Sequence, residues 1–232
     1  MTDPYSYSDI AKMIDHSLLN PSLTVAELEA GCELARRYDV ASVCILPYYV
    51  GRCAELLAGT TVQPSTTIGF PHGGHATGTK LAEADQALKD RATELDMVIN
   101  ISKSRSGDWQ YVKREIQLLT EFTHARGAKI KVIFENAYQD TESKIRLCAI
   151  CGEIGVNWVK TSTGYAASGA TMDDLRLMRK HSPGRVQVKA AGGIRTLDAL
   201  LEARAIGVTR VGATRTAEML EECKKRLALV AG

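Results

Sequence analysis

Short apolar runs, rich in β-branched residues, alternate with longer amphipathic stretches along almost the whole chain. The runs have the length of buried strands, and the stretches between them have the periodicity of helices that bury one face. The pattern predicts eight strands, at residues 13–18, 42–46, 66–69, 95–101, 130–135, 158–161, 186–190 and 210–212.

Helix-start signals mark the stretches between the predicted strands. Thr24 and Thr171 are each followed three positions later by an acidic residue, and Thr196 opens the stretch after the seventh strand. Such hydroxyl residues cap helix N-termini. Gly155 and Gly207 follow apolar periodic stretches and suit helix C-termini. A further helix is expected over residues 5–12, before the first strand.

Eight strand–helix units with no linker between them predict an α/β fold: a single-domain (β/α)₈ barrel over residues 1–232. An open, doubly wound sheet is the alternative, and the absence of a G-x-G-x-x-G after the first strand disfavours it. In a barrel, the loops after the strands meet at one face, where active sites are built. The residues that follow the predicted strands are therefore the first candidates for chemistry.

The composition narrows the class of protein. The chain is 45% hydrophobic and 24% charged with a formal net charge of +2, as in ordinary globular proteins. Its basic residues are spread out, so no nucleic-acid partner is expected. No apolar run approaches the roughly 20 residues that a membrane helix requires. Residues 1–5 carry no export signal, so we expect a cytoplasmic protein with no membrane partner.

The cysteines are expected to be buried thiols in such a compartment. Cys148 and Cys151 form a CxxC in an apolar helical stretch, without the second ligand pair that zinc would need. Core packing is therefore the expected role of this pair, and redox or zinc chemistry is the alternative.

Charged residues interrupt the predicted strands. They are Asp15, Asp96, Lys131, Glu135, Lys160 and Lys189. Because charge in a barrel interior is costly without a partner, this set implies ion pairing and a wet pocket at the barrel mouth. The alternative is an interior ion-pair network without chemistry.

The two lysines at the ends of the sixth and seventh strands point to covalent catalysis. Lys160 lies in VKTSTG (159–164) and Lys189 in VKAAGG (188–193). A desolvated site and a neighbouring cation both disfavour the charged amine, so one of the two lysines can act as a nucleophile near neutral pH. A neutral lysine forms an imine with a carbonyl, which makes cleavage of a nearby carbon–carbon bond feasible. The hydroxyls that follow Lys160, including that of Thr163, mildly favour Lys160, but composition does not decide between the two.

Glycine-rich loops after the last two strands suggest a phosphate site. Gly192 and Gly193 follow the seventh strand, and Thr214 and Arg215 follow the eighth. Loops in these positions, with a helix N-terminus, bind phosphate in many barrels, and an arginine adds a bidentate charge. The alternative is a pair of tight turns with solvated arginines.

His72 and His75 follow the third strand and raise the possibility of a zinc-dependent aldolase. A zinc site takes three or four ligands, and no third donor with regular spacing follows. We therefore expect no metal.

With these pieces assembled, the chain resembles the deoxyribose-phosphate aldolase family of class I (Schiff-base) aldolases. The resemblance runs from about residue 14 to 220. It is most specific in WVKTSTG (158–164) and VKAAGGIRT (188–196), and IDHSLL (14–19), SVC (42–44), IGFP (68–71), ELDMVIN (94–100) and KVIFE (131–135) support it. The resemblance implies a TIM barrel that reversibly cleaves 2-deoxy-D-ribose 5-phosphate to D-glyceraldehyde 3-phosphate and acetaldehyde, without metal or cofactor.

The resemblance also implies roles for individual residues. Lys160 corresponds to the imine-forming lysine, Lys189 to the neighbour that lowers its pKa, and Asp96 to the carboxylate that moves protons, through a water. Asp15 and Lys131 match the polar barrel interior of the family, which contacts the substrate.

Gly192, Gly193 and the loop at Thr214 match the phosphate-binding elements of the family. The chain departs from its pattern at Arg215, where a serine is common, at Leu46, where a polar residue is common, and at Tyr165, where some members have lysine. Members are usually cytoplasmic and form homodimers or larger homo-oligomers.

Two other functions stay open at this point. One is a class I aldolase for a different or unphosphorylated sugar. The other is a catalytically silent sugar-phosphate-binding protein, although Lys160, Lys189 and Asp96 are all present.

Overall fold

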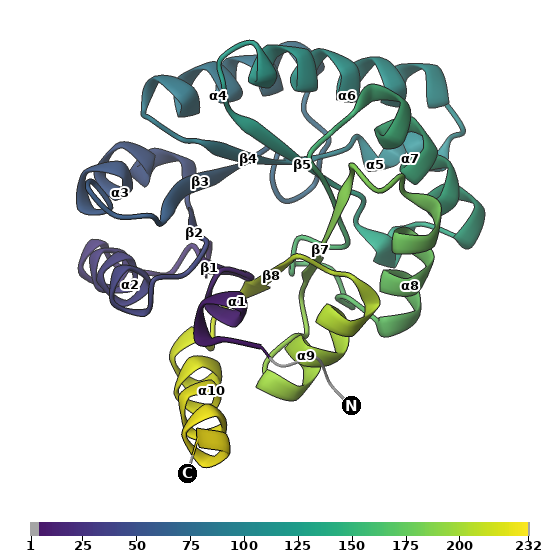
Figure 1. The fold of residues 1–232 in the computed structure, drawn as a ribbon. Coiled ribbons are helices and arrows are strands. Elements are labelled where there is room, and N and C mark those ends of the chain that lie inside the picture. The colour runs from purple at the N-terminus through teal and green to yellow at the C-terminus, as the bar shows by residue number, and fades with distance from the viewer. Residues whose placement is uncertain (1–4, 232) are drawn as a thin grey trace.

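The computed structural model describes residues 5–231. Its strands are all parallel and pair in chain order, and the last pairs with the first to close a barrel, so the expected (β/α)₈ architecture is confirmed (Figure 1). The strands are β1 (Ile14–Leu18), β2 (Ser42–Ile45), β3 (Gln63–Ile68), β4 (Glu94–Val98), β5 (Lys129–Ile133), β6 (Trp158–Lys160), β7 (Gln187–Ala191) and β8 (Arg210–Ala213).

Helices surround the barrel (Figure 1). The α-helices are α1 (Tyr7–Ala11), α2 (Val25–Tyr38), α3 (Val50–Leu56), α4 (Thr77–Lys89), α5 (Ile101–Arg105), α6 (Trp109–His124), α7 (Thr141–Ile154), α8 (Met172–His181), α9 (Leu197–Ile206) and α10 (Thr216–Ala231). Two 3₁₀ turns lie in the loops: η1 (Pro47–Tyr49) comes after β2, and η2 (Asn136–Tyr138) comes after β5. In the part of the chain that the structure describes, every helix is too short or too polar to cross a membrane.

The helix boundaries follow the capping signals in the sequence. The side chains of Thr24, Thr171 and Thr196 cap α2, α8 and α9, each by accepting a hydrogen bond from the backbone N–H three residues further on. Gly155 and Gly207 end α7 and α9 in the left-handed conformation, with φ of 83° and 97°. Both sets of predictions are confirmed, because a cap depends on local chemistry that the sequence carries.

Three strand predictions were wrong by two residues or more at an end. The strand expected over residues 130–135 stops at Ile133, because Glu135 takes the left-handed conformation before η2. The strand expected over residues 95–101 stops at Val98, and the Asn100 side chain caps α5 by accepting from the Lys103 N–H at 3.1 Å. The apolar pattern continues past the strand because Ile99 and Ile101 still pack against the core. The strand expected from residue 66 already begins at Gln63. Its first residues, Gln63, Pro64 and Ser65, are not apolar side chains typical of a strand, so the sequence pattern does not show where it starts.

The apolar core lies between the barrel and its helices. In β4, Leu95 and Met97 belong to this core, whereas Asp96 between them points into the barrel. In β7, Val188 and Ala190 belong to the core on either side of Lys189. Alternate residues of a strand point to opposite faces, so both strands send charged side chains inward while their neighbours pack outward.

Candidate active site

The strand register brings the two predicted lysines together. Lys160 on β6 and Lys189 on β7 are direct partners in the parallel ladder. Both ammonium groups bind one carboxylate oxygen, Asp96 Oδ2, at 2.7 Å from Lys160 Nζ and 2.8 Å from Lys189 Nζ. All three side chains are buried. The candidate nucleophile, its cationic neighbour and the candidate proton carrier are therefore in direct contact.

A second layer of charge lies behind this triad. Lys131 Nζ is 2.8 Å from Asp96 Oδ1 and 2.6 Å from Glu94 Oε2. Asp15 Oδ2 is 2.5 Å from Lys189 Nζ, and its other oxygen lies 2.5 Å from Arg210 Nη1. Arg210 also binds Glu94, at 2.8 Å. The interior network predicted from the strand charges therefore exists, and it supports the lysine pair.

The charges of this ion-paired set do not balance if every group is ionised. Four cationic side chains, those of Lys131, Lys160, Lys189 and Arg210, face the carboxylates of Asp15, Glu94 and Asp96. An uncompensated charge is costly in a buried site. The set is neutral when one lysine has lost its proton.

The electrostatic surroundings identify that lysine. Burial lowers the pKa of Lys160, and the charge of Lys189 lowers it further, against the opposing effect of Asp96. Burial also disfavours the Lys189 cation, but Asp15 and Asp96 outweigh it and raise the pKa of Lys189. The pKa of Asp96 lies well below its ordinary value, because Lys131, Lys160 and Lys189 together overcome the effect of burial. Of the two, Lys160 is thus the amine that loses its proton more easily, a distinction that composition did not provide.

The pair opens into a cavity of about 860 Å³ at the carboxyl ends of the strands. Asp15, Lys160, Thr163 and Lys189 line it, together with the loops after β7 and β8. Asp96 and Lys131 do not line the cavity and lie beneath it, in contact with the lysines. A ligand in the cavity therefore meets the two lysines first and the Asp96 carboxylate only through them or through water.

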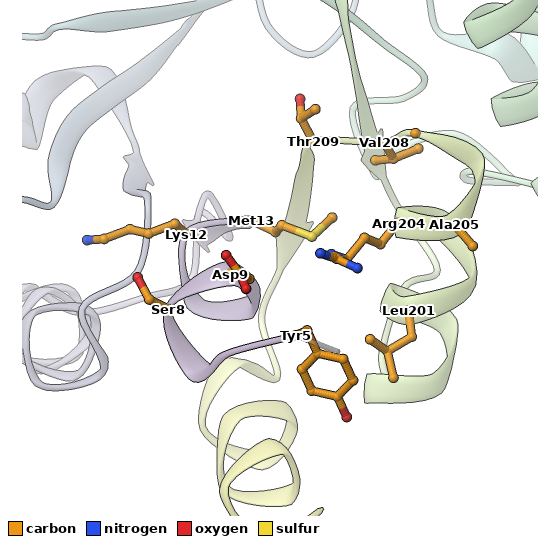
Figure 2. Close-up of a pocket in the computed structure, with 11 residues that line it drawn as sticks. Tyr5, Ser8, Asp9, Lys12, Met13, Leu201, Arg204, Ala205, Val208 and Thr209 are labelled. Atoms are coloured by element: carbon orange, nitrogen blue, oxygen red, sulfur yellow. The ribbon is translucent and has the colours of Figure 1, made fainter. Parts of the chain in front are cut away.

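A cavity of similar size, about 920 Å³, lies at the opposite end of the barrel, between α1 and α9 (Figure 2). Two of its charged groups have local partners: Asp9 accepts from the backbone N–H of Ser6, the N-cap of α1, and Lys12 pairs with Asp39 at 2.6 Å. Arg204 also lines this cavity. None of its lining residues belongs to the buried ion-paired set. We therefore assign the chemistry to the cavity over Lys160.

Comparison with known proteins agrees with this geometry. The DeoC/LacD family aldolase model matches residues 10–212. The chain belongs to the DeoC/LacD family of aldolases. It is 64% identical to the deoxyribose-phosphate aldolase of Rhodopirellula baltica over 98% of this chain and 94% of that protein. It is 45% identical to that of Caldanaerobacter subterraneus subsp. tengcongensis over 95% of this chain and 96% of that protein.

A solved structure extends the family relationship to the fold. The deoxyribose phosphate aldolase from Aeropyrum pernix, described as a unique tetrameric structure, superposes with a TM-score of 0.87 at 29% identity. The match covers 95% of this chain and 93% of that one.

The glycine residues after β7 and the loop after β8 lie at the cavity rim. Gly192 and Gly193 line the cavity with φ of 75° and 100°, a region that disfavours side chains. A Cβ at Gly192 would lie 2.9 Å from the Cα of Gly169. Thr214 is exposed at the same rim, two residues before α10 begins. Position 192 therefore requires glycine, both for its backbone conformation and for its close approach to the loop after β6.

Arg215, which the sequence places in the predicted phosphate site, does not line this rim with Gly192, Gly193 and Thr214. Its guanidinium pairs with Glu218 at 2.5 Å on the outside of α10, and it does not line the cavity. This partner, three residues further on in the first turn of α10, holds it there. Arg195, which does line the cavity, is the exposed arginine on this side of the mouth.

Tyr165, in the loop after β6, crosses the mouth. Its hydroxyl donates to the Leu19 carbonyl at 2.7 Å, and its ring meets Phe70 edge to face with centroids 5.4 Å apart. In the closed ring of eight strands β6 is opposite β2, and Leu19 and Phe70 follow β1 and β3. A smaller pocket of about 210 Å³, lined partly by Leu46 and Phe70, lies beside this side chain.

Sequence reasoning missed Glu94 and Arg210. Glu94 lies two positions before Asp96 and therefore on the same face of β4, a period-two signal that was present. Arg210 begins β8, where a charge is easily interpreted as a solvated strand end. Both prove to be buried or nearly so, and each binds the other.

The remaining candidates are accounted for by their positions. Cys148 and Cys151 are buried free thiols of the core, as predicted. His72 and His75 are exposed after β3 and do not line the cavity. Within residues 5–231, no group of three or more His, Cys, Asp or Glu side chains is arranged to hold a metal ion.

Proposed function

We propose that this protein is a class I aldolase that reversibly cleaves 2-deoxy-D-ribose 5-phosphate to D-glyceraldehyde 3-phosphate and acetaldehyde through an imine on Lys160. The curated relatives named above are deoxyribose-phosphate aldolases, one of them 64% identical to this chain. The observation that carries the mechanism is the buried lysine pair on one oxygen of Asp96, in which Lys160 has the lowered pKa and Lys189 the raised one.

The first step uses the neutral amine of Lys160. Its nitrogen attacks the aldehyde carbon C1 of the open-chain sugar, and water leaves to give a protonated imine. Lys189 carries a proton beside the reacting nitrogen, and Asp96 binds both amines, so the two supply and remove the protons that carbinolamine breakdown requires.

The imine then accepts the electrons of the breaking bond. The C3 hydroxyl loses its proton, the C2–C3 bond breaks, and the electron pair moves to the iminium nitrogen to form an enamine. C3 becomes the aldehyde carbon of glyceraldehyde 3-phosphate. Protonation of the enamine at C2 and hydrolysis of the imine release acetaldehyde and return the Lys160 amine. We assign these proton transfers to Asp96, through Lys189 or a water, because its carboxylate lies just beneath the cavity.

The phosphate is proposed to bind over Gly192, Gly193 and Thr214. Exposed backbone N–H groups and the N-terminus of α10 favour an anion at this rim. Asp15 and Lys131 act from below: Asp15 borders the cavity, and Lys131 holds Asp96 in place at 2.8 Å.

Reductive trapping tests the proposal. Sodium borohydride with acetaldehyde should attach a two-carbon adduct to Lys160, located by peptide mass spectrometry. The adduct should be lost in Lys160→Ala and kept in Lys113→Ala, whose side chain forms an exposed ion pair with Glu153. A chelator should leave cleavage of the sugar phosphate unchanged. Turnover without any adduct on Lys160, or an adduct on Lys189 instead, contradicts the proposal.

One observation favours a second candidate, an aldolase of the same kind for unphosphorylated sugars. Arg215 pairs with Glu218 instead of facing the cavity. Comparing 2-deoxyribose 5-phosphate with 2-deoxyribose separates the two functions, because equal kcat/KM for both would remove the role of the phosphate site.

We also propose that the chain acts as one domain and as a homo-oligomer in the cytoplasm. The tetrameric relative supports self-association. Light scattering after size-exclusion chromatography, with a monomer as the contradicting result, tests the assembly.

A further inference from the structure

Glu135, directly after β5, has a buried carboxylate outside the ion-paired set. It is 2% exposed, and the described hydrogen bonds to its side chain all come from Thr163. The Thr163 N–H is 3.3 Å from each carboxylate oxygen, and the Thr163 hydroxyl makes a short contact with Oε2. A buried charge group devoted to one neighbour needs a reason beyond packing.

The backbone at Glu135 adds a second observation. Its φ of 54° and ψ of 69° lie in the left-handed region, which costs a non-glycine residue about 1–2 kcal/mol. Such conformations persist where the surrounding structure requires them, and they cluster at functional sites. Here the conformation directly follows the strand that carries Lys131, and the Glu135 side chain reaches Thr163 in the loop after β6, which borders the cavity.

The hydroxyl of Thr163 has little remaining freedom. A threonine hydroxyl has one proton to donate and two lone pairs to accept with. Its proton is directed to Glu135, and one lone pair accepts from the Tyr165 N–H at 3.0 Å. Thr163 lines the cavity over Lys160. Toward a molecule in that cavity, the hydroxyl can therefore act only as an acceptor.

We propose that Glu135 is a positioning residue of the aldol reaction: by holding the proton of the Thr163 hydroxyl, it makes Thr163 an acceptor for a hydroxyl group of the sugar. The inference rests on the proposed function, because it concerns the same cavity. It distinguishes substrates by chemistry. A hydroxylated aldehyde gains a hydrogen bond from Thr163, whereas acetaldehyde has no hydroxyl and gains nothing.

Glu135→Gln tests this directly. The amide keeps the size of the side chain but replaces one acceptor oxygen with an NH₂ donor, so it no longer dictates which way the Thr163 proton points. We expect kcat/KM for 2-deoxyribose 5-phosphate to fall about tenfold, as for loss of one hydrogen bond. The rate of borohydride trapping with acetaldehyde should stay within about twofold of the wild-type rate, by the same argument.

Thr163 variants and a matched control complete the experiment. Thr163→Val should show the same split between cleavage and trapping, Thr163→Ser should restore cleavage, and Glu135→Gln with Thr163→Val should fall no further than either change alone. Thr66→Val removes another buried hydroxyl, which donates to the Ile45 carbonyl at 2.6 Å between β3 and β2, and should leave the ratio of cleavage to trapping unchanged. Glu135→Asp, which withdraws the carboxylate by one methylene, should show the same split as Glu135→Gln.

Three results overturn the inference: unchanged cleavage in Glu135→Gln, an equal loss of cleavage and acetaldehyde trapping, or additive effects in the double variant. An equal loss would mean that Glu135 acts on Lys160 or on the fold. Failure of the wild-type protein to form an adduct on Lys160 is a different result, because it refutes the proposed function itself.

Discussion

Replacing Lys189 with leucine tests the electrostatic argument for Lys160. Both ammonium nitrogens bind Asp96 Oδ2, at 2.7 and 2.8 Å, so they are no more than about 5.5 Å apart. At an effective dielectric constant of about 20, two unit charges at that distance repel by about 3 kcal/mol, or about two pKa units. Without Lys189, the pKa of Lys160 should rise by about that amount.

The assay is the pH dependence of acetaldehyde trapping and of kcat/KM in Lys189→Leu. Because a higher pKa leaves less neutral amine, the alkaline shift should be about two pH units, with a loss of up to about 100-fold at neutral pH. The fold should survive, since Asp15 keeps Arg210 and Asp96 keeps Lys131 as partners.

Lys144→Leu is the matched control. Its ammonium pairs with Asp174 on the outer helices, at 2.7 Å, so both profiles should match those of the wild-type protein. A Lys189→Leu protein that folds and keeps the wild-type pH profile would refute the reasoning, because it would show that the neighbouring cation does not set the proton affinity of Lys160.

Three further results are expected. The folded state lowers the pKa of Asp96, so this residue contributes stability that is present above its unfolded pKa of about 4 and is lost as pH falls toward the folded value. In urea unfolding at pH 2–5, the free energy of unfolding of Asp96→Asn should therefore fall less steeply with acid than that of the wild-type protein. Gly192→Ala should raise the KM for the sugar phosphate several-fold, since φ is 75° and the new Cβ would meet Gly169 in the loop after β6. Arg215→Ala should change this KM less than twofold, and steady-state kinetics tests both expectations. Lys80→Met should lower the free energy of unfolding by about 3–5 kcal/mol, because it leaves the buried Glu115 carboxylate, 2.9 Å from the Lys80 ammonium, without this partner. Chemical denaturation measures this loss, and a loss below about 1 kcal/mol would contradict the prediction.

The lysine pair was predictable because parallel strands bring their carboxyl ends together. Residues 158–161 and 186–190 are predicted as neighbouring parallel strands, and both lysines lie near the carboxyl ends of these strands. The observed register then pairs Lys160 directly with Lys189. The identity of the neutral lysine was not predictable in this way. It depends on Asp15, 174 positions before Lys189 in the chain, which binds Lys189. No local pattern encodes that contact.

Other differences follow from competition between nearby partners. Arg215 was expected at the phosphate rim, but Glu218 one helical turn away takes its guanidinium. Glu135 was noticed as a charge in a strand, and its part in orienting a hydroxyl depends on Thr163, 28 positions further on. Sequence patterns place residues on elements reliably. They do not decide which of several acceptors or donors a long side chain reaches.

The Tyr165 side chain has a consequence for how the entrance varies among related sequences. Its hydroxyl rests on a main-chain carbonyl, at Leu19, so this anchor does not depend on which side chain occupies position 19. A smaller side chain at position 165 would lose this contact across the mouth without touching the buried charges below. Substitution of Tyr165 can therefore change the size of the cavity mouth for bulkier aldehydes while the amine chemistry of Lys160 beneath it stays intact.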